Sequence, residues 1–509
     1  MSALAQNSPG PAISVNPAAD QHPISPYIYG MAEYGVTPKY QAAARLSVMR
    51  WGGDGTSRYN WIVDSSNAGF DWYFMGGDGN ASPVPSAEPD ALVAADNATN
   101  TSTLLTIPII PYINNSAAWS CSFPVSVYGA QQATNPYVFP NGQTCGNSIA
   151  SNGTQLLDSN IPVNNVANTP ATQAAWVQHL VAKFGPGIKG GGVRFYQLDN
   201  EPFGWSNTHR DIMPNGATYA TISTLGAEYA AAVKQQDGSA LIFGPSDFTL
   251  GGWIGTPSQQ NNLFAGQYYL QQMAAAGHAN GRRLLDSFDE HYYFNFTDVT
   301  SQLASTRTLW DPTYNGGTWV EKYWFDGPMQ LIPRFQQWIA QYYPGTRLSF
   351  SEYSIDSGHK LVTDAIAEAD VLGIFGREQV ALATMWNPPQ PTDPIAFSFL
   401  LFRNVNGKGL AFGSTSVQTV SDDQGEVSAY AALQGPGALT LVLINKTTSN
   451  LTTPIRIAGQ TGTTNAAFYS YGNADLTAIH KLANVPFSAG TGNVTLPAYS
   501  MNMLVILLD

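Results

Sequence analysis

The sequence predicts an α/β protein in which a (β/α)8 (TIM-type) barrel at residues 24–396 carries an accessory antiparallel β-sandwich, built from residues 1–23 and 397–509. Two observations favour this fold. Up to about residue 390, short apolar β-type runs alternate with helix-like segments, the pattern of parallel strands joined by crossover helices. After residue 397 the chain changes to short alternating runs separated by Gly, Thr, Asn and Pro, as in antiparallel sandwiches.

Eight runs have the composition of barrel strands. They are 27–30, 47–52, 104–113, 194–198, 241–245, 287–292, 347–351 and 381–386. Segments such as 172–184 and 219–236 lie between them and repeat apolar residues every three or four positions, which predicts amphipathic helices. Eight strand–helix units predict a closed barrel, whose function is then expected at the carboxyl ends of the strands.

Alternating apolar and polar residues mark the strands of the sandwich. Runs at 439–445, 466–471 and 501–508 have this pattern, which favours half-buried strands. The segment 13–16 is expected to add an edge strand, because terminal segments are often held by sheet pairing.

Two insertions, 70–100 and 117–168, are longer than ordinary barrel loops. Their Trp and Tyr content favours walls of a binding site. Both cysteines, Cys121 and Cys145, lie in the second insertion, in a stretch rich in Gly, Asn, Pro and Ser. A disulfide formed in an oxidising compartment and a pair of free buried thiols are both open at this point.

The composition excludes several classes of protein. With 22 Lys and Arg against 35 Asp and Glu, the formal charge is −13, which argues against a nucleic-acid partner bound through a basic face. Apolar residues make up 44% and charged residues 11%, so the chain is expected to fold and not to be disordered. Apolar runs stay shorter than the ~18 residues of a membrane span, so no membrane partner is expected. The 12 Trp, 25 Tyr and 23 Phe suit stacking on neutral sugar rings.

The first residues contain Ala3-Leu4-Ala5 before Gln6, a small-x-small pattern like that of a signal-peptidase site. This pattern indicates the remnant of a removed export signal and therefore a secreted protein. A terminal tail without function is an equal alternative.

Two glutamates follow expected strands. The strand 194–198 leads into Asn200 and Glu201, and Pro202 then prevents the strand from continuing, so Glu201 is expected at the barrel mouth. The strand 347–351 is followed directly by Glu352. In chain order these are the fourth and seventh expected strands. A lone glutamate is more often an ion-pair partner or a helix cap, so the presence of a second one decides the interpretation.

Two carboxylates aimed into one aromatic cleft can cleave a glycosidic bond, because one protonates the leaving oxygen while the other attacks or activates water. A separation of ~5 to 5.5 Å is typical of retaining enzymes and ~6.5 to 9.5 Å of inverting ones. The acid needs burial or a nearby negative charge to keep its proton, whereas a nucleophile needs hydrogen-bond donors that keep it ionised.

A series of different short motifs extends from about Arg50 to Ser428. They are Met49-Arg50-Trp51-Gly52-Gly53-Asp54, Ser57-Arg58-Tyr59-Asn60-Trp61, and the segments 198–202, 208–211, 289–293, 331–334, 351–353 and 373–378. In this order and spacing the set resembles glycoside hydrolase family 44, the retaining endo-β-1,4-glucanases and xyloglucanases. The resemblance covers most of the chain.

The resemblance implies a barrel with a β-sandwich and a retaining mechanism in which Glu201 is the general acid/base and Glu352 the nucleophile. Asn200 would bind the sugar 2-hydroxyl. Arg50 would donate to Glu352 and hold it ionised, with a structural ion pair as the alternative. The chemistry would need no cofactor. Because relatives of the family carry calcium, a structural calcium ion is also expected, with ligands that the sequence does not identify.

Strand alternation puts Asp289, His291 and Tyr293 on one face. By analogy, His291 or Tyr293 is expected to bond the nucleophile. The competing interpretation is a metal centre that uses His209, Asp211, Asp289 and His291, although the chain has no HExxH motif.

Aromatic residues near the expected barrel mouth are candidates for sugar subsites. Trp386 ends the eighth expected strand and could form a floor beneath the reacting sugar, with core packing as a comparable alternative. Further candidates are Trp51, Trp205, Tyr73 and Trp324.

The sequence therefore predicts a secreted, monomeric, endo-acting glycoside hydrolase that cleaves the β-1,4-glucan backbones of plant cell-wall polysaccharides. Xyloglucan, xylan and mannan are further expected substrates. Asp54 stands where the family pattern has Asn, and Phe294 where it has Pro, which leaves subsite preference open. A non-catalytic carbohydrate-binding protein and a metal-dependent hydrolase are the alternatives.

Overall fold

A computed structural model describes residues 7–136, 140, 142–158, 161–248, 251–435 and 437–509. The segment 3–5, which resembles a signal-peptidase cleavage site, lies outside these residues. Two compact units divide the chain: one comprises Met1–Val48, Tyr293–Phe335 and Glu352–Asp509, and the other Met49–Tyr292 and Gln336–Ser351. The domain boundaries expected near residues 24 and 397 stay a prediction. Among the described residues, no helix is long and apolar enough to span a bilayer.

Eight strands close into a barrel, which confirms the predicted fold class. In barrel order they are β4 (Gly30–Ala32), β5 (Val48–Trp51), β7 (Ser102–Ile107), β11 (Phe195–Leu198), β12 (Leu241–Asp247), β13 (Ser287–Tyr293), β14 (Arg347–Ser354) and β15 (Leu382–Met385). Parallel registers join β7 to β11, β11 to β12, β12 to β13 and β15 to β4. Because the strands are parallel and follow chain order, their carboxyl ends share one rim.

Prolines explain two differences from the expected strands. The run 27–30 was expected to be extended, but Pro26–Ile28 forms a 3-10 turn in which the Ser25 hydroxyl accepts the Tyr27 N–H, and β4 begins at Gly30. The run 104–113 was expected to be one strand. Pro108 and Pro111 interrupt it, so β7 ends at Ile107 and a separate strand, β8 (Tyr112–Asn114), pairs with β10 (Asn165–Ala167).

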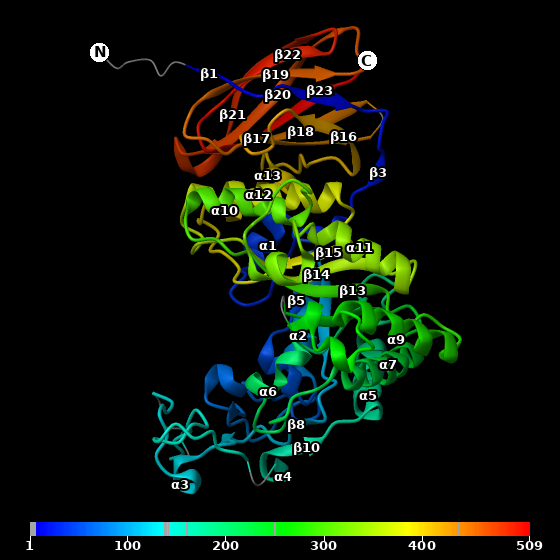
Figure 1. Ribbon diagram of the computed structural model, residues 1–509, viewed down its shortest axis with the longest axis vertical. Helices are drawn as coiled ribbons and strands as arrows, with labels where there is room; N and C mark the ends of the chain where they lie inside the picture. The colour runs from blue at the N-terminus through cyan, green and yellow to red at the C-terminus, as the bar shows by residue number, and fades with distance from the viewer. Residues whose placement is uncertain (1–6, 137–139, 141, 159–160, 249–250, 436) are drawn as a thin grey trace. The chain divides into compact units, whose positions relative to one another are not determined.

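Helices follow most barrel strands. The helices of eight residues or more are α2 (Ala87–Ala98), α5 (Pro170–Phe184), α7 (Tyr219–Gln236), α9 (Ala265–Asn280), α11 (Leu331–Tyr342), α12 (Val362–Arg377) and α13 (Ala396–Asn404). Threonine caps set two of the predicted helix starts, because Thr169 and Thr218 each accept a backbone N–H from the first turn. Helices α5, α7 and α9 pack side by side (Figure 1).

The shorter helices fall in connections. They are α1 (Pro38–Ala44), α3 (Val125–Tyr128), α4 (Ile161–Asn164), α6 (Trp205–Thr208), α8 (Gly251–Ile254) and α10 (Val299–Ser305). Within the second insertion, the strand β9 (Ser120–Cys121) pairs with β6 (Met75–Gly76), and Cys121 is disulfide-bonded to Cys145. Of the two alternatives, a disulfide and a pair of free buried thiols, the structure has the disulfide.

The antiparallel domain is one continuous sheet. Its strands are β1 (Ser8–Pro9), β2 (Ile13–Asn16), β3 (His22–Pro23), β16 (Thr415–Ser421), β17 (Val427–Leu433), β18 (Ala438–Asn445), β19 (Leu451–Ile457), β20 (Thr463–Gly472), β21 (Asp475–Ser488), β22 (Thr491–Leu496) and β23 (Ser500–Leu507). Because β22 pairs with both β21 and β19, the sheet curls around a single core of alternating side chains such as Leu439, Leu441 and Leu443.

The N-terminal strand lies inside this sheet, not at its edge as expected. β2 pairs antiparallel with β16 on one side and parallel with β19 on the other. Figure 1 shows this blue segment among the orange and red strands. Ile13 and Val15 are almost fully buried in the core of the sheet, so β2 contributes directly to the hydrophobic core of the domain.

Candidate active site

Glu201 stands on a constrained turn beyond β11. Its φ of 45° lies in the left-handed region, as does that of Asp199 at 65°, and such backbone is costly for residues with a side chain. The turn is held because the buried Asp199 carboxylate accepts the N–H groups of Ile109, Ile110 and Asn200. The Glu201 N–H donates to the Ser246 carbonyl at 2.9 Å. The neighbouring backbone therefore fixes the direction of the Glu201 side chain.

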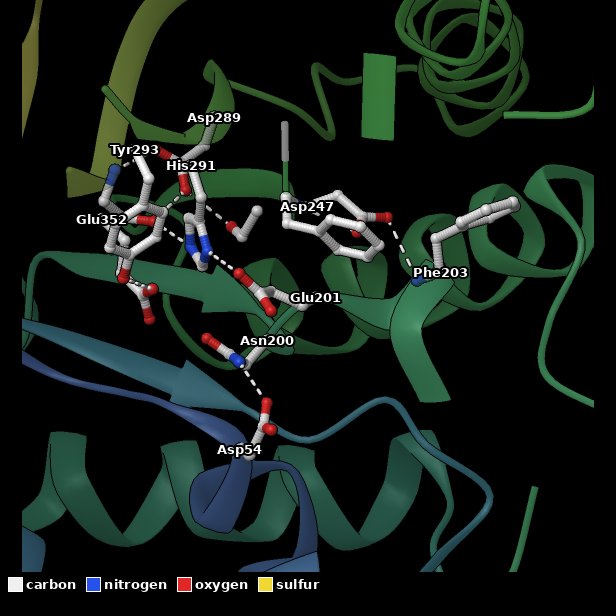
Figure 2. A network of polar contacts seen from close by, with 12 residues as sticks. Asp54, Asn200, Glu201, Phe203, Asp247, Asp289, His291, Tyr293 and Glu352 are labelled. Atoms are coloured by element: carbon white, nitrogen blue, oxygen red, sulfur yellow. Dashed lines mark hydrogen bonds and ion pairs between the residues drawn. The ribbon is translucent and has the colours of Figure 1, made fainter. Parts of the chain in front are cut away.

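Asn200 is oriented from both ends of its side-chain amide. Buried Arg50 donates from Nη2 to Asn200 Oδ1 and from Nε to Gln197 Oε1, both at 2.7 Å. Asn200 Nδ2 donates to Asp54 Oδ1 at 2.9 Å (Figure 2). Since an amide nitrogen carries two hydrogens, one hydrogen of Nδ2 remains after this bond for a sugar hydroxyl. The predicted donation from Arg50 to Glu352 stays a prediction.

His291 contacts Glu201 directly. Its Nδ1 lies 2.8 Å from Glu201 Oε1, and its Nε2 lies 3.2 Å from the Ser351 hydroxyl. The imidazole is fully buried, whereas the Glu201 side chain keeps 21% of its surface exposed. Glu201 is therefore accessible to a ligand and has one buried hydrogen-bonding partner behind it.

Asp247, on β12, is a second carboxyl close to Glu201. It accepts the Phe203 N–H and the Tyr219 hydroxyl through Oδ2 and the Phe248 N–H through Oδ1 (Figure 2). Burial, and to a smaller extent the negative charge of Glu201, raise the pKa of Asp247 to about 7 against the opposing effect of these hydrogen bonds. The charge of Glu201 therefore favours a proton on Asp247.

Glu352 lies on β14 and is nearly buried. The hydroxyl of Tyr293, at the end of β13, donates to Glu352 Oε2 at 2.7 Å (Figure 2). A phenol that donates to a carboxylate stabilises the ionised form. The expectation that Tyr293 or His291 bonds the second glutamate is thus met by Tyr293, while His291 bonds Glu201.

Two of the predicted aromatic platforms do not fit the structure. Trp51 is buried against Tyr59 and Trp176, and its indole N–H donates to Glu88. Trp205 has no exposed surface. A ring without an exposed face cannot stack on a sugar, so both predictions were wrong, and these residues pack the interior.

The other predicted aromatic residues keep exposed surface. Trp324 is 40% exposed, and Trp386 is half-buried with its ring edge-on to Tyr34. Tyr73 packs against Trp72, which is itself 44% exposed. Further exposed rings lie in the same segments. They could not be selected from the sequence, because nothing in the local pattern distinguishes an exposed tryptophan or tyrosine from a buried one. These rings are Trp72, Trp319 and Tyr323.

The proposed metal centre is not supported by the side-chain contacts. Both oxygens of Asp211 accept hydrogen bonds, from Arg58 at 3.0 Å and from Ser122. Both oxygens of Asp289 accept serine hydroxyls. Burial lowers the pKa of His209 to about 3, so its imidazole is neutral and could bind a metal ion. Asp211, the second ligand of the expected centre, is instead bonded to Arg58 and Ser122. The expected calcium ion stays a prediction.

Three polar residues that orient the site were not selected from the sequence for that role. Gln197 accepts from Arg50, Asp54 accepts from Asn200, and Ser351 contacts His291. Its position directly before Glu352 could have indicated Ser351. The contacts of Gln197 and Asp54 depend on neighbouring strands and loops that a single sequence does not place.

Comparisons with known proteins identify the family of the chain. The model of glycoside hydrolase family 44 matches residues 65–296. Endoglucanase A of Paenibacillus lautus is 29% identical over 97% of this chain and 72% of its own length. CelM2, a bifunctional glucanase-xylanase from a metagenome library, is 34% identical with a TM-score of 0.92, over 99% of this chain and 100% of its own. Cel44A, a family 44 endoglucanase from Clostridium thermocellum, is 27% identical with a TM-score of 0.79, over 97% of this chain and 99% of its own.

Sequence similarity extends over the full length of a solved relative at more than 30% identity, and the family model covers the segment that carries Asn200, Glu201 and His291. The protein is therefore an enzyme of the glycoside hydrolase class, and the chain belongs to glycoside hydrolase family 44.

Proposed function

We propose that this enzyme cleaves β-1,4-glucan backbones internally by a retaining double displacement, with Glu201 as general acid/base and Glu352 as nucleophile. The names of the relatives support the substrate class, since two are endoglucanases and one is a glucanase-xylanase. Retention of configuration is what the family resemblance implies.

The observation that carries the proposal is the pairing of each glutamate with one residue of β13. His291 bonds Glu201, and Tyr293 bonds Glu352. Residues two apart on a strand point to the same face. Two carboxyls that bond successive residues of one strand face are therefore candidates to act on one glycosidic bond.

The two environments differ in the sense that the chemistry needs. Glu352 accepts a phenol hydrogen bond, which favours the carboxylate and suits a nucleophile. Glu201 lies near the buried carboxyl of Asp247 and against the buried imidazole of His291, and it is the more exposed of the two glutamates. This difference supports the roles proposed for the two glutamates.

In the first step, Glu352 attacks the anomeric carbon while Glu201 transfers its proton to the leaving oxygen, and the glycosidic C–O bond breaks. In the second step, Glu201 takes a proton from water, and the resulting hydroxide displaces Glu352. Asn200, held by Arg50 and Asp54, would donate to the sugar 2-hydroxyl in both steps.

Reducing-end release from carboxymethylcellulose tests the proposal. Glu201→Gln and Glu352→Gln are each expected to lose most of the activity, while binding to cello-oligosaccharides by calorimetry persists. Variants that both remain near wild-type rates would show that other groups do the chemistry. An α anomer as the first product would contradict retention. Rates on xylan, xyloglucan and mannan would define the substrate range.

We also propose that the protein is exported and acts as a monomer on plant cell-wall polysaccharide. The disulfide between Cys121 and Cys145 supports export, because such bonds form and persist in oxidising compartments. Fractionation of the native host culture, with the disulfide assayed by thiol labelling, tests this location.

A further inference from the structure

A buried carboxylate, Asp289, lies behind the acid/base pair and is saturated with donors. Its Oδ2 accepts the hydroxyls of Ser246 and Ser351, and its Oδ1 accepts the Ser349 hydroxyl and the Ser351 N–H. All four contacts bring a donor to the carboxyl group. A protonated Asp289 would itself need an acceptor for its O–H group, so the arrangement fits the ionised form. Figure 2 shows Asp289 beside His291 in this network.

This anion determines which way the Ser351 hydroxyl points. A serine hydroxyl has one hydrogen, and that hydrogen is donated to Asp289. Ser351 Oγ can therefore only accept from His291 Nε2, which lies 3.2 Å away. A ring nitrogen that donates carries a hydrogen, so His291 has its hydrogen on Nε2.

The tautomer of His291 then sets the hydrogen bond to Glu201. In neutral His291 with hydrogen on Nε2, Nδ1 is a bare acceptor 2.8 Å from Glu201 Oε1. When Glu201 is protonated, its O–H group can donate a hydrogen bond to Nδ1 at this distance. When Glu201 is ionised, the lone pairs of Oε1 and Nδ1 face each other and repel. The alternative, with hydrogen on Nδ1, would stabilise the ionised carboxylate and release the acid proton.

We propose that Asp289 and Ser351 are positioning residues that fix the Nε2–H tautomer of His291 and so keep the acid proton on Glu201 for transfer to the leaving oxygen. The inference rests on the proposed function, because it concerns the acid that this function assigns. The proton stays bonded to Glu201, with His291 Nδ1 as its hydrogen-bond acceptor, until Glu201 transfers it to the leaving oxygen, which takes the electron pair of the broken glycosidic bond. His291 keeps its Nε2 hydrogen throughout.

Other charged groups face the pair and act in both the wild type and the variants. They are Asp247 from β12, Arg50 and Asp54 through Asn200, and, under the proposed function, Glu352 with Tyr293. A substitution at Ser351 replaces none of these residues, and Ser349→Ala is the control from the same strand, so a difference between the two variants reports the His291 contact.

The chain provides a matched pair of variants. Ser351→Ala removes the acceptor of His291 and one donor of Asp289, whereas Ser349→Ala removes one donor of Asp289 from the same strand and leaves His291 untouched. Ser351→Thr retains the hydroxyl and is the conservative variant. Circular dichroism and melting curves establish that all three fold.

The first measurement is the pH profile of kcat/KM on an aryl cellobioside with a poor leaving group, which reports the free enzyme. Ser351→Ala is expected to move the alkaline limb to lower pH by about one unit, since hydrogen bonds to charged groups change proton affinities about tenfold or more. Ser349→Ala and Ser351→Thr should keep the wild-type limb. On a dinitrophenyl cellobioside, whose departure needs no acid, the rates should hardly differ.

The second measurement does not depend on activity. Nitrogen NMR of histidine-labelled protein, with the His291 signals assigned through His291→Asn, is expected to show hydrogen on Nε2 in the wild type and its loss in Ser351→Ala. Hydrogen on Nδ1 in the wild type, in a neutral ring or in an imidazolium, or superimposed alkaline limbs for Ser351→Ala and Ser349→Ala, would overturn the inference. An inactive wild type with an Nε2–H ring would refute the proposed function and leave the tautomer assignment standing.

Discussion

Replacement of Tyr293 by phenylalanine isolates one hydrogen bond to the proposed nucleophile. The Tyr293 hydroxyl donates to Glu352 Oε2 at 2.7 Å, and the substitution removes that oxygen while it preserves the ring. Hydrogen bonds to charged groups contribute about 1.5 to 3 kcal/mol. Because 39% of Tyr293 is exposed, the lower figure applies, about 1.5 kcal/mol.

The sign follows from the protonation state that the bond favours. The phenol stabilises ionised Glu352, so in the wild type the carboxylate keeps its charge to lower pH. Without the phenol, the acidic limb of the kcat/KM profile should move to higher pH by about one unit, since one pH unit corresponds to about 1.4 kcal/mol. The plateau rate should fall roughly tenfold, because Glu352 loses a contact that orients its attack.

The assay is the initial rate on an aryl cellobioside between pH 3 and pH 9. Tyr499→Phe, at the turn before β23, is the control for the same chemical change in the antiparallel sheet. An acidic limb of Tyr293→Phe that coincides with those of the wild type and of Tyr499→Phe would refute the argument that Tyr293 keeps Glu352 ionised.

Three further predictions concern stability. Lys446→Met leaves Asp370 buried with only the Thr306 and Tyr430 hydroxyls, so denaturant unfolding should show a loss of about 3 kcal/mol that shrinks at low pH as Asp370 gains a proton. The exposed Lys481→Met is the control, and equal midpoints for the two variants would contradict the ion-pair argument. Reduction of the Cys121–Cys145 bond should open the loop between these residues to limited proteolysis and cost up to about 3 kcal/mol, whereas equal cleavage of both forms would show that the bond constrains nothing. Burial raises the pKa of Glu368 from 4.5 to about 8, so the folded state binds a proton that the unfolded state has lost, and stability should decrease as pH rises between these values. Glu368→Gln should flatten that part of the melting-temperature profile, and an unchanged slope would mean that Glu368 is ionised in the folded protein.

The elements with strong local signals could be predicted from the sequence. All eight barrel strands exist, because each is an apolar run bounded by turn residues. Glu201 follows the fourth strand as expected, whereas the seventh strand continues to Ser354, so Glu352 lies within it and not after it. The segment 13–16 was also predicted as a strand. Its place between β16 and β19 was not, since a local pattern carries no information about which strands will flank it.

Burial of individual aromatic residues could not be predicted. Trp205 and Trp324 look alike as residues in loops after barrel strands, but one is fully buried and the other is 40% exposed. Only the tertiary packing decides between these outcomes, since both rings are large, apolar and able to donate one hydrogen bond. The positions of the two glutamates could therefore be predicted from sequence motifs, whereas the aromatic surfaces that would bind the rest of the polysaccharide could not.

The strand β13 presents three residues of its Asp-Glu-His-Tyr-Tyr sequence to the proposed active site. Asp289, His291 and Tyr293 alternate on one face, where they orient Ser351, Glu201 and Glu352 respectively. A shift of the strand by one residue would turn all three away together and bring Glu290 and Tyr292 in their place. The chemistry of both carboxyls therefore depends on a single register, and this makes β13, as much as either glutamate, the element whose alteration should abolish activity.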